Sequence, residues 1–271
     1  MLLDNYHFYK RFKKPELETF ENKSISELRI KYFDGLNIPF HYFNKNNQVK
    51  LDDSFSYVLI DDANIEIESS SDVLIIENIS KKDISVNLKN YSKKVVLINN
   101  PQSSLHNESN FKINNLNESD FFFANIKNNT FSKSNLSFDL EKNLNLNSLI
   151  NTQFNQTFDL SVEVLHQSLT QSNIDFIGLN EGKLVSQINS IVPKNTHNCE
   201  LHQHIKHILL NEKALSYSKP SLMISTPCVA SHGNSIGSIP DDWMFFLNAR
   251  GINSEKANEI IKNSLKIEFL N

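Results

Sequence analysis

The chain has 271 residues, of which 39% are hydrophobic and 19 are phenylalanine, so it is long enough to fold around one large core or two small ones. The chain contains 38 asparagines but only six glycines, and so few glycines argue against a glycine-rich phosphate-binding fold. A charged fraction of 21% with a net charge of −4 indicates no general attraction to nucleic acid or to an anionic membrane.

The N-terminal region, residues 1–52, is expected to be a helical segment. Its first fifteen residues mix aromatics with lysines and lack the continuous apolar stretch of a signal peptide. Ser24 and Glu27 then form a capping box, apolar residues follow at helical spacing, and Gly35 stands where a helix would end.

The central region, residues 53–238, is predicted to be a β-structure. Short apolar runs recur about every 10 to 12 residues, and several alternate apolar and polar positions. Asn, Ser, Asp and Lys separate these runs, with few Gly or Pro residues for tight hairpins. This pattern favours a parallel β-helix, in which asparagine replaces glycine in left-handed positions and stacks in ladders. A hairpin-built β-sandwich is the alternative.

The C-terminal region, residues 239–271, has helical patterning again. Pro240, Asp241 and Asp242 suit a first helical turn, and Gly251 suits its end. Asn253 is placed to cap a second helix, whose apolar face comprises Ala257, Ile260, Ile261, Leu265 and Phe269. This unit is too small for a core of its own, so we expect it to pack on the β-structure or on another protein.

One short motif, Gly233–Gly237, matches the G-x-S-x-G pattern of a hydrolase nucleophile elbow. That fold requires a histidine after the nucleophile, and none follows Ser235. We therefore interpret these residues as a turn before the helix near Pro240. His232 would lie in the same turn with an accessible ring.

Several metal-ligand side chains gather between residues 197 and 207. They are His197, Cys199, His202, His204 and His207. In a strand, His202 and His204 share one face and His207 points to the other, so the set does not converge on a single zinc ion. We expect exposed or interface histidines here. The only other cysteine is Cys228, so a disulfide framework is not expected and a reducing compartment is.

The C-terminal half resembles the SufD family, whose members belong to the SufBCD iron–sulfur cluster assembly complex. Ser231–Gly237, followed by Arg250-Gly251-Ile252 and Ala257, is similar to its S-H-G-A-T-x-G … R-G-I … A pattern. Similar matches upstream are Lys219–Ile224 to K-P-x-L-E-I, Ile208–Ala214 to L-L-L-S-D-x-A, and His166, Ser172, Gly178 and Gly182 to an H-x-x-P … S … Y-K-G-V-L-x-G block. The paralogue SufB typically carries H-E-A-T where this chain has His232-Gly233, which favours SufD.

The resemblance implies a right-handed parallel β-helix with flanking helical segments, acting as a non-enzymatic scaffold. Such a subunit pairs with a SufB-like subunit through its β-helix, or with a second copy, and binds a SufC-like ABC ATPase through its C-terminal helices. No cofactor would be stably bound. A transient iron–sulfur cluster would form at the SufB interface, in the cytoplasm or in a plastid.

The resemblance also assigns roles to single residues. His232 falls on the histidine implicated in holding the nascent cluster, and Cys228 is a second, weaker candidate, because Ala230 occupies the position where relatives often have cysteine. Partner-binding candidates on the C-terminal helices are Trp243, Phe246, Arg250 and Gly251. No residue is assigned a catalytic role.

Two other functional classes fit a solenoid. A polysaccharide lyase or hydrolase would need acidic or basic residues clustered in one groove, and usually secretion. A β-solenoid adhesin would need a more regular repeat. The scarcity of glycine makes one further prediction, that most of five glycines have positive φ or close packing: Gly178, Gly182, Gly233, Gly237 and Gly251.

Overall fold

The computed structural model describes residues 40–102, 105–125 and 130–254, together with 256, 257, 259–261 and 264. The helix expected from Ser24, its cap Gly35, and the C-terminal apolar residues Leu265 and Phe269 lie outside the described residues. Among the described residues, no helix is long and apolar enough to cross a membrane.

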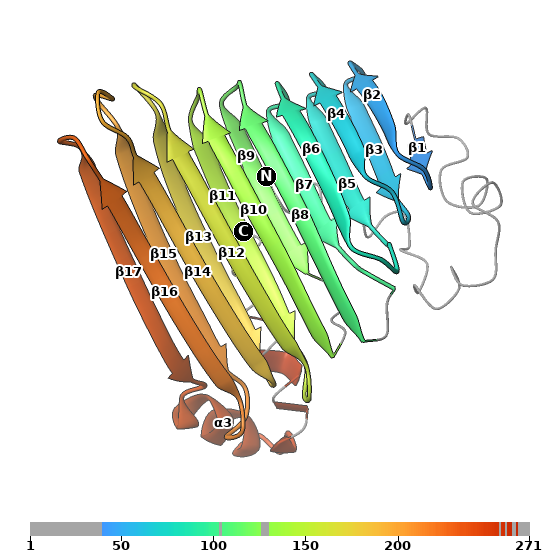
Figure 1. Cartoon of the computed structure of the whole chain (residues 1–271). Coiled ribbons are helices and arrows are strands. Elements are labelled where there is room, and N and C mark those ends of the chain that lie inside the picture. Colours follow the sequence, from blue (N-terminus) through green and yellow to red (C-terminus); the bar gives the residue numbers. More distant parts are fainter. Residues whose placement is uncertain are drawn as a thin grey trace.

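The described chain winds into a solenoid of two parallel sheets, in which successive strands alternate between the sheets (Figure 1). The odd sheet contains β1 (Phe40–Phe43), β3 (Phe55–Ile60), β5 (Val73–Asn78), β7 (Lys94–Asn99), β9 (Ser119–Asn125), β11 (Leu144–Thr152), β13 (Gln171–Asn180), β15 (Glu200–Leu209) and β17 (Val229–Ser238). The even sheet contains β2 (Asn47–Leu51), β4 (Ile65–Ser69), β6 (Ile84–Asn90), β8 (His106–Asn115), β10 (Phe131–Leu140), β12 (Thr157–His166), β14 (Lys183–Val192) and β16 (Leu215–Ile224). The predicted mainly β solenoid is confirmed; its right-handed sense stays a prediction.

The coils lengthen along the chain. In the odd sheet, Tyr57 of β3 lies opposite Ile75 of β5, whereas Glu200 of β15 lies opposite Val229 of β17, a much longer step along the sequence. The later strands are correspondingly longer, for example ten residues in β15 against six in β3. The unequal coil length explains why the sequence repeat is irregular.

The core lies between the two sheets and is built by alternation along most of the longer strands, whereas the short strands β3 and β5 are buried almost continuously. In β10, every second residue is buried, beginning at Ser132. The largest fully buried side chains are aromatic, namely Phe123, Phe138, Phe158 and Phe176. Phe138 packs edge-to-face on Phe121 with ring centroids 5.2 Å apart. Burying one such side chain contributes about 1.5–3 kcal/mol to folding.

Asparagine stacks in ladders at the coil corners, as predicted. Asn78 Nδ2 donates to Asn99 Oδ1 at 2.8 Å, and Asn99 Nδ2 donates to Asn125 Oδ1 at 3.1 Å. All three side chains are 3% exposed or less, and buried amides need hydrogen-bond partners. Each coil supplies such a partner to the asparagine of the neighbouring coil. Among the described non-glycine residues, left-handed backbone positions fall on three asparagines, Asn155, Asn195 and Asn198, and also on Asp62 and Leu169.

The structure corrects two local assignments. Strands begin at Phe40, so residues 40–43 and 47–51, which we assigned to a helical segment, form β1 and β2. Residues 229–238, which include the expected turn at Gly233–Gly237, form β17 instead. Hydrogen bonding to β15 holds this glycine-containing segment extended, because the ladder depends on the backbone and not on side-chain propensity.

Close packing or positive φ occurs at three of the five glycines. A Cβ at Gly182 would lie 2.4 Å from the carbonyl oxygens of Gln153 and Gln156, and one at Gly178 would lie 2.2 Å from Leu184 Cδ2. Gly251 has φ +79°. Gly233 and Gly237 sit in ordinary strand geometry with room for a side chain, so the prediction, which was made for most of the five glycines, is confirmed at the other three.

The C-terminal unit packs on the outer side of the odd sheet. Helix α3 (Asp241–Asn248) begins after Pro240, and Asn253 Oδ1 accepts the Lys256 amide at 2.9 Å in a second helical segment within 254–264. One apolar cluster joins these elements to the strands and includes Leu179, Ile208, Met244, Leu247 and Ile261. The expected packing on the β-structure is therefore confirmed (Figure 1).

Candidate functional site

The terminal coil, formed by β16 and β17, is the end of the described stack opposite β1 and β2 (Figure 1). Each inner strand is covered by coils on both sides, but β16 and β17 each have a strand partner on one side only. Inward-facing apolar side chains are consequently exposed here, at Ile224 (41%) and Ile236 (44%). Exposed apolar side chains at the open end of a stack are typical of an interaction site.

His232 lies on β17 on the side that faces the solenoid interior. Its in-register neighbour on β15 is Gln203, which is 2% exposed, and Asn234, two residues later, donates from Nδ2 to Ser218 O on β16 at 3.5 Å. No described coil follows β17, so the ring of His232 is exposed although it points inward. Within the described part of the chain, this ring makes no hydrogen bond, which leaves its nitrogens accessible to a ligand or partner.

Two buried polar side chains of β15 lie behind the terminal strand, Gln203 opposite His232 and His207 opposite Ile236. Gln203 donates from Nε2 to Ser190 Oγ at 2.8 Å, and His207 Nε2 is hydrogen bonded to Ser186 Oγ at 2.9 Å. Gln203 Oε1 and His207 Nδ1 have no partner among the described residues. Burial lowers the pKa of His207 to about 4, so this imidazole is neutral at physiological pH.

The two cysteines lie next to each other and away from His232. Each immediately precedes a strand, Cys199 before β15 and Cys228 before β17, and the Val229 amide donates to Cys199 O at 3.1 Å. Burial, and then the nearby Cys199 thiol, raises the pKa of Cys228. An extended strand separates the Cα atoms of Cys228 and His232 by about 13 Å. A cluster role for Cys228 stays a prediction.

The three histidines of the 197–207 cluster that lie on β15 divide between its two faces, as predicted. The expectation that they are exposed is wrong for His207, and His197 lies in the preceding loop, where its Nδ1 is hydrogen bonded to Ser168 Oγ. His202 is hydrogen bonded through Nδ1 to Ser231 Oγ at 2.6 Å and through Nε2 to Glu200 Oε1 at 2.9 Å. His204 Nδ1 lies 3.5 Å from Asp175 Oδ1 on the same outer face. His207 is buried inside. Among the described residues, no three His, Cys, Asp or Glu side chains gather as a metal site.

Helix α3 presents an exposed aromatic surface. Trp243, Phe245 and Phe246 are 46%, 75% and 52% exposed, while Met244 and Leu247 pack toward the sheet. The Arg250 guanidinium lies 3.6 Å from the centre of the Phe246 ring, a cation–π contact that orients it at the surface. We name Trp243, Phe245, Phe246 and Arg250 the α3 patch. Gly251 follows it in the left-handed conformation that ends the helix.

Sequence reasoning did not include Phe245 or Gln203 among the site residues. Phe245 is the most exposed aromatic of α3. Met244 and Leu247 have the three-residue spacing of one helical face and pack on the sheet, and this spacing could have predicted that Phe245 lies on the solvent-exposed face. Gln203 is in register with His232 only because of the length of the coil that leads from β15 to β17. That length is not visible in an irregular repeat.

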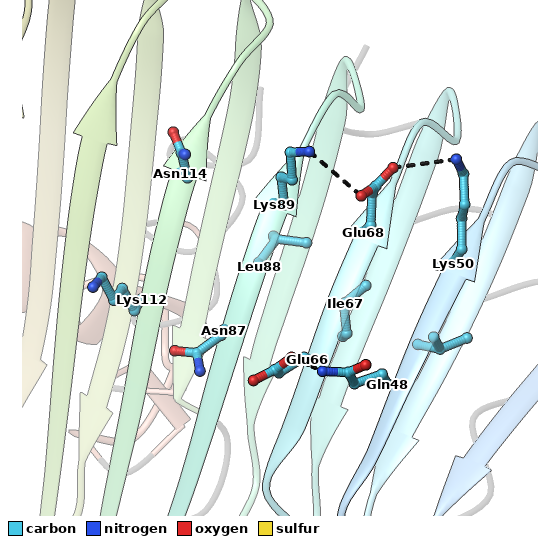
Figure 2. Close-up of a pocket in the computed structure, with 11 residues that line it drawn as sticks. Gln48, Lys50, Glu66, Ile67, Glu68, Asn87, Leu88, Lys89, Lys112 and Asn114 are labelled. Carbon is cyan, nitrogen blue, oxygen red and sulfur yellow. Dashed lines mark hydrogen bonds and ion pairs between the residues drawn. The ribbon is translucent and has the colours of Figure 1, made fainter.

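A shallow groove on the outer face of the even sheet tests the lyase or hydrolase alternative (Figure 2). Glu68 bridges two neighbouring strands, with Lys50 Nζ at 3.2 Å and Lys89 Nζ at 3.5 Å, and Gln48 donates to Glu66. Lys50, followed by Lys89, lowers the pKa of Glu68. A general acid needs a raised pKa, so this paired carboxylate suits a surface ion-pair network better than glycosidic cleavage.

Two comparisons with known proteins bear on the family of the chain. A search of curated proteins found no match. The family model described as "SUF system FeS cluster assembly, SufBD core domain" matches residues 56–265, which include His232, the two cysteines and α3. The chain therefore belongs to the SufBD core family of the SUF system for iron–sulfur cluster assembly.

Proposed function

We propose that this chain is a SufD-type scaffold subunit. In this proposal it has no catalytic activity, pairs through its terminal coil with a SufB-like subunit, and binds a SufC-like ABC ATPase through the α3 patch. The iron–sulfur cluster is cargo that assembles at the subunit interface and then leaves. Membership of a family of assembly components is compatible with a non-enzymatic role.

The observation that carries the proposal is the position of His232. It is exposed on the interior side of the last strand, at the open end of the solenoid, where a second subunit would cover it. Imidazole binds iron, and a site that is completed only by a partner holds a cluster loosely enough to release it. The Ser231-His232-Gly233 sequence supports the SufD type over the SufB type.

The test of cluster binding is co-expression with a SufB-like and a SufC-like partner from the same source. His232→Ala is expected to leave the complex assembled but to lower the iron and acid-labile sulfide recovered with it. His204→Ala is the matched control, because His204 is an exposed histidine on the outer face of the neighbouring strand. Equal iron and sulfide in wild type and His232→Ala would refute the assigned role.

The test of partner pairing uses the terminal coil. Ile236 is 44% exposed on β17, and a charged side chain there would have to be desolvated in an interface. Ile236→Asp should therefore abolish association with the SufB-like subunit while leaving the isolated chain folded. If this variant still elutes with the partner in size-exclusion chromatography, the terminal coil is not the interface. A stable dimer of the chain alone would identify a second copy as the partner.

The test of ATPase binding uses the α3 patch. Phe246→Ala and Arg250→Ala remove an exposed ring and the cation stacked on it, so stability should change little. We expect each to weaken binding of the SufC-like ATPase about tenfold or more. Phe154→Ala is the control, since Phe154 is equally exposed at 56% but lies in a turn outside the C-terminal unit. Unchanged binding by both patch variants would refute this part of the proposal.

A further inference from the structure

The two cysteines occupy equivalent positions in successive coils. Each is the residue immediately before a strand of the odd sheet, and the first paired residues of those strands, Glu200 and Val229, lie opposite each other. The Val229 amide donates to Cys199 O at 3.1 Å, which continues the parallel ladder back to the cysteines. The preceding loops are also aligned, because the hydroxyls of Thr196 and Thr226 are hydrogen bonded at 3.2 Å.

This alignment fits the backbone geometry of a disulfide. Adjacent strands lie about 4.8 Å apart, and disulfides join Cα atoms separated by about 4.4–6.8 Å. Both side chains contact one small apolar cluster with Val192 and Leu201. In the structure both thiols are free, and Cys199 Sγ donates to Gln167 O at 3.2 Å. Closing the bond therefore requires Cys199 to rotate about its Cα–Cβ bond, at the cost of one weak S–H hydrogen bond.

We propose that Cys199 and Cys228 are an oxidisable dithiol, which a peroxide closes into a disulfide that fastens the terminal strand β17 to β15. Cys228 is part-exposed and Cys199 is 3% exposed, so Cys228 meets the oxidant first, and its raised pKa makes this step slow at neutral pH because little thiolate is present. Its sulfur attacks the O–O bond, forming a sulfenic acid and releasing water. Cys199 then attacks that sulfur, forming the S–S bond and expelling the hydroxyl as a second water. Two thiols are oxidised and one peroxide is reduced.

This modification site is independent of the proposed cluster role, since the disulfide needs no partner subunit, iron or ATPase. Its consequence for the fold is local. The bond would fix the start of β17, the strand that carries His232 and has a β-partner on one side only. An uncovered edge strand is expected to open most easily, and a covalent bond at the residue just before it opposes that opening.

The test treats the reduced, purified full chain with hydrogen peroxide. We expect loss of both free thiols, an intact-mass loss of two hydrogen atoms, and one peptide pair joining Cys199 to Cys228, all reversed by dithiothreitol. Cys199→Ser should instead stop at a sulfenic acid that dimedone traps on Cys228, and Cys228→Ser should leave the Cys199 thiol reduced. Oxygen adducts without a cross-link in the wild-type chain, or a cross-link between two chains, would overturn the proposal. The wild-type peptide map decides this even if a variant fails to fold.

Discussion

The two buried histidines make the stability of the solenoid sensitive to mild acid. His166 and His207 are each 1% exposed, and burial lowers the pKa of each from the ordinary value of 6.5 to about 4. Between pH 6.5 and about 4, the unfolded chain binds a proton at each position and the folded chain does not. Stability therefore falls as pH decreases through this window, by about 3 kcal/mol per histidine over the whole interval.

The contacts explain why these rings stay neutral when folded. His166 Nδ1 and Nε2 are hydrogen bonded to Thr170 Oγ1 at 2.9 Å and to Ser172 Oγ at 3.0 Å. His207 packs on Phe176 with ring centroids 5.3 Å apart. Both surroundings are uncharged, so an added proton finds no counter-charge among these contacts.

The assay is urea unfolding at intervals from pH 7.5 to 4.5. The wild-type free energy of unfolding should decrease by several kcal/mol, and the double variant His166→Gln/His207→Gln should lose most of that dependence. His202→Gln is the control, because His202 is a partly exposed histidine on the same strand as His207. The carboxylates are the same in the wild type and the double variant, and the control changes only the neighbour of Glu200, so the difference between the slopes isolates the buried histidines. Identical slopes for the wild type and the double variant would refute the reasoning.

Two further predictions compare matched positions by urea unfolding. Gly182→Ala should destabilise the chain by about 1–3 kcal/mol, because its Cβ would lie 2.4 Å from two backbone oxygens, whereas Gly237→Ala, with nothing within 4 Å, should change little. A result in which both variants are equally stable would contradict the packing at Gly182. Asn99→Ala should cost about 2–4 kcal/mol, because it leaves buried ladder amides unpaired. Asn145→Ala, in an exposed ladder, should cost under about 1 kcal/mol, and equal losses would show that burial of the ladder is unimportant.

Much of the fold could be predicted because it depends on local patterns. Alternation of apolar and polar residues marks the strands, and the acidic first turn after Pro240 marks α3. The patterns failed where pairing with a neighbouring coil decides the conformation. Gly233 and Gly237 carry a turn-like composition but are strand, because β15 supplies a complete row of backbone partners.

The candidate site could be predicted only in part. The motifs point to His232, Trp243, Phe246 and Arg250, and the structure places them at the open end of the solenoid and on α3. Their surroundings depend on coil length. The length of the coil between β15 and β17 sets His232 opposite Gln203 and, at the coil entrance, Cys228 beside Cys199. No local pattern in the sequence predicts the length of this coil.

The sequence by itself determined the solenoid class, the asparagine ladders and the C-terminal helices, because alternation, turn chemistry and capping act over a few residues. Only the tertiary structure decided which side chains are exposed at the last coil and which polar groups are buried behind it. The reason is that β17 is covered on one side alone. An inward-facing residue is buried at Gln203 and exposed at His232 solely because the first has a following coil and the second, within the described chain, does not.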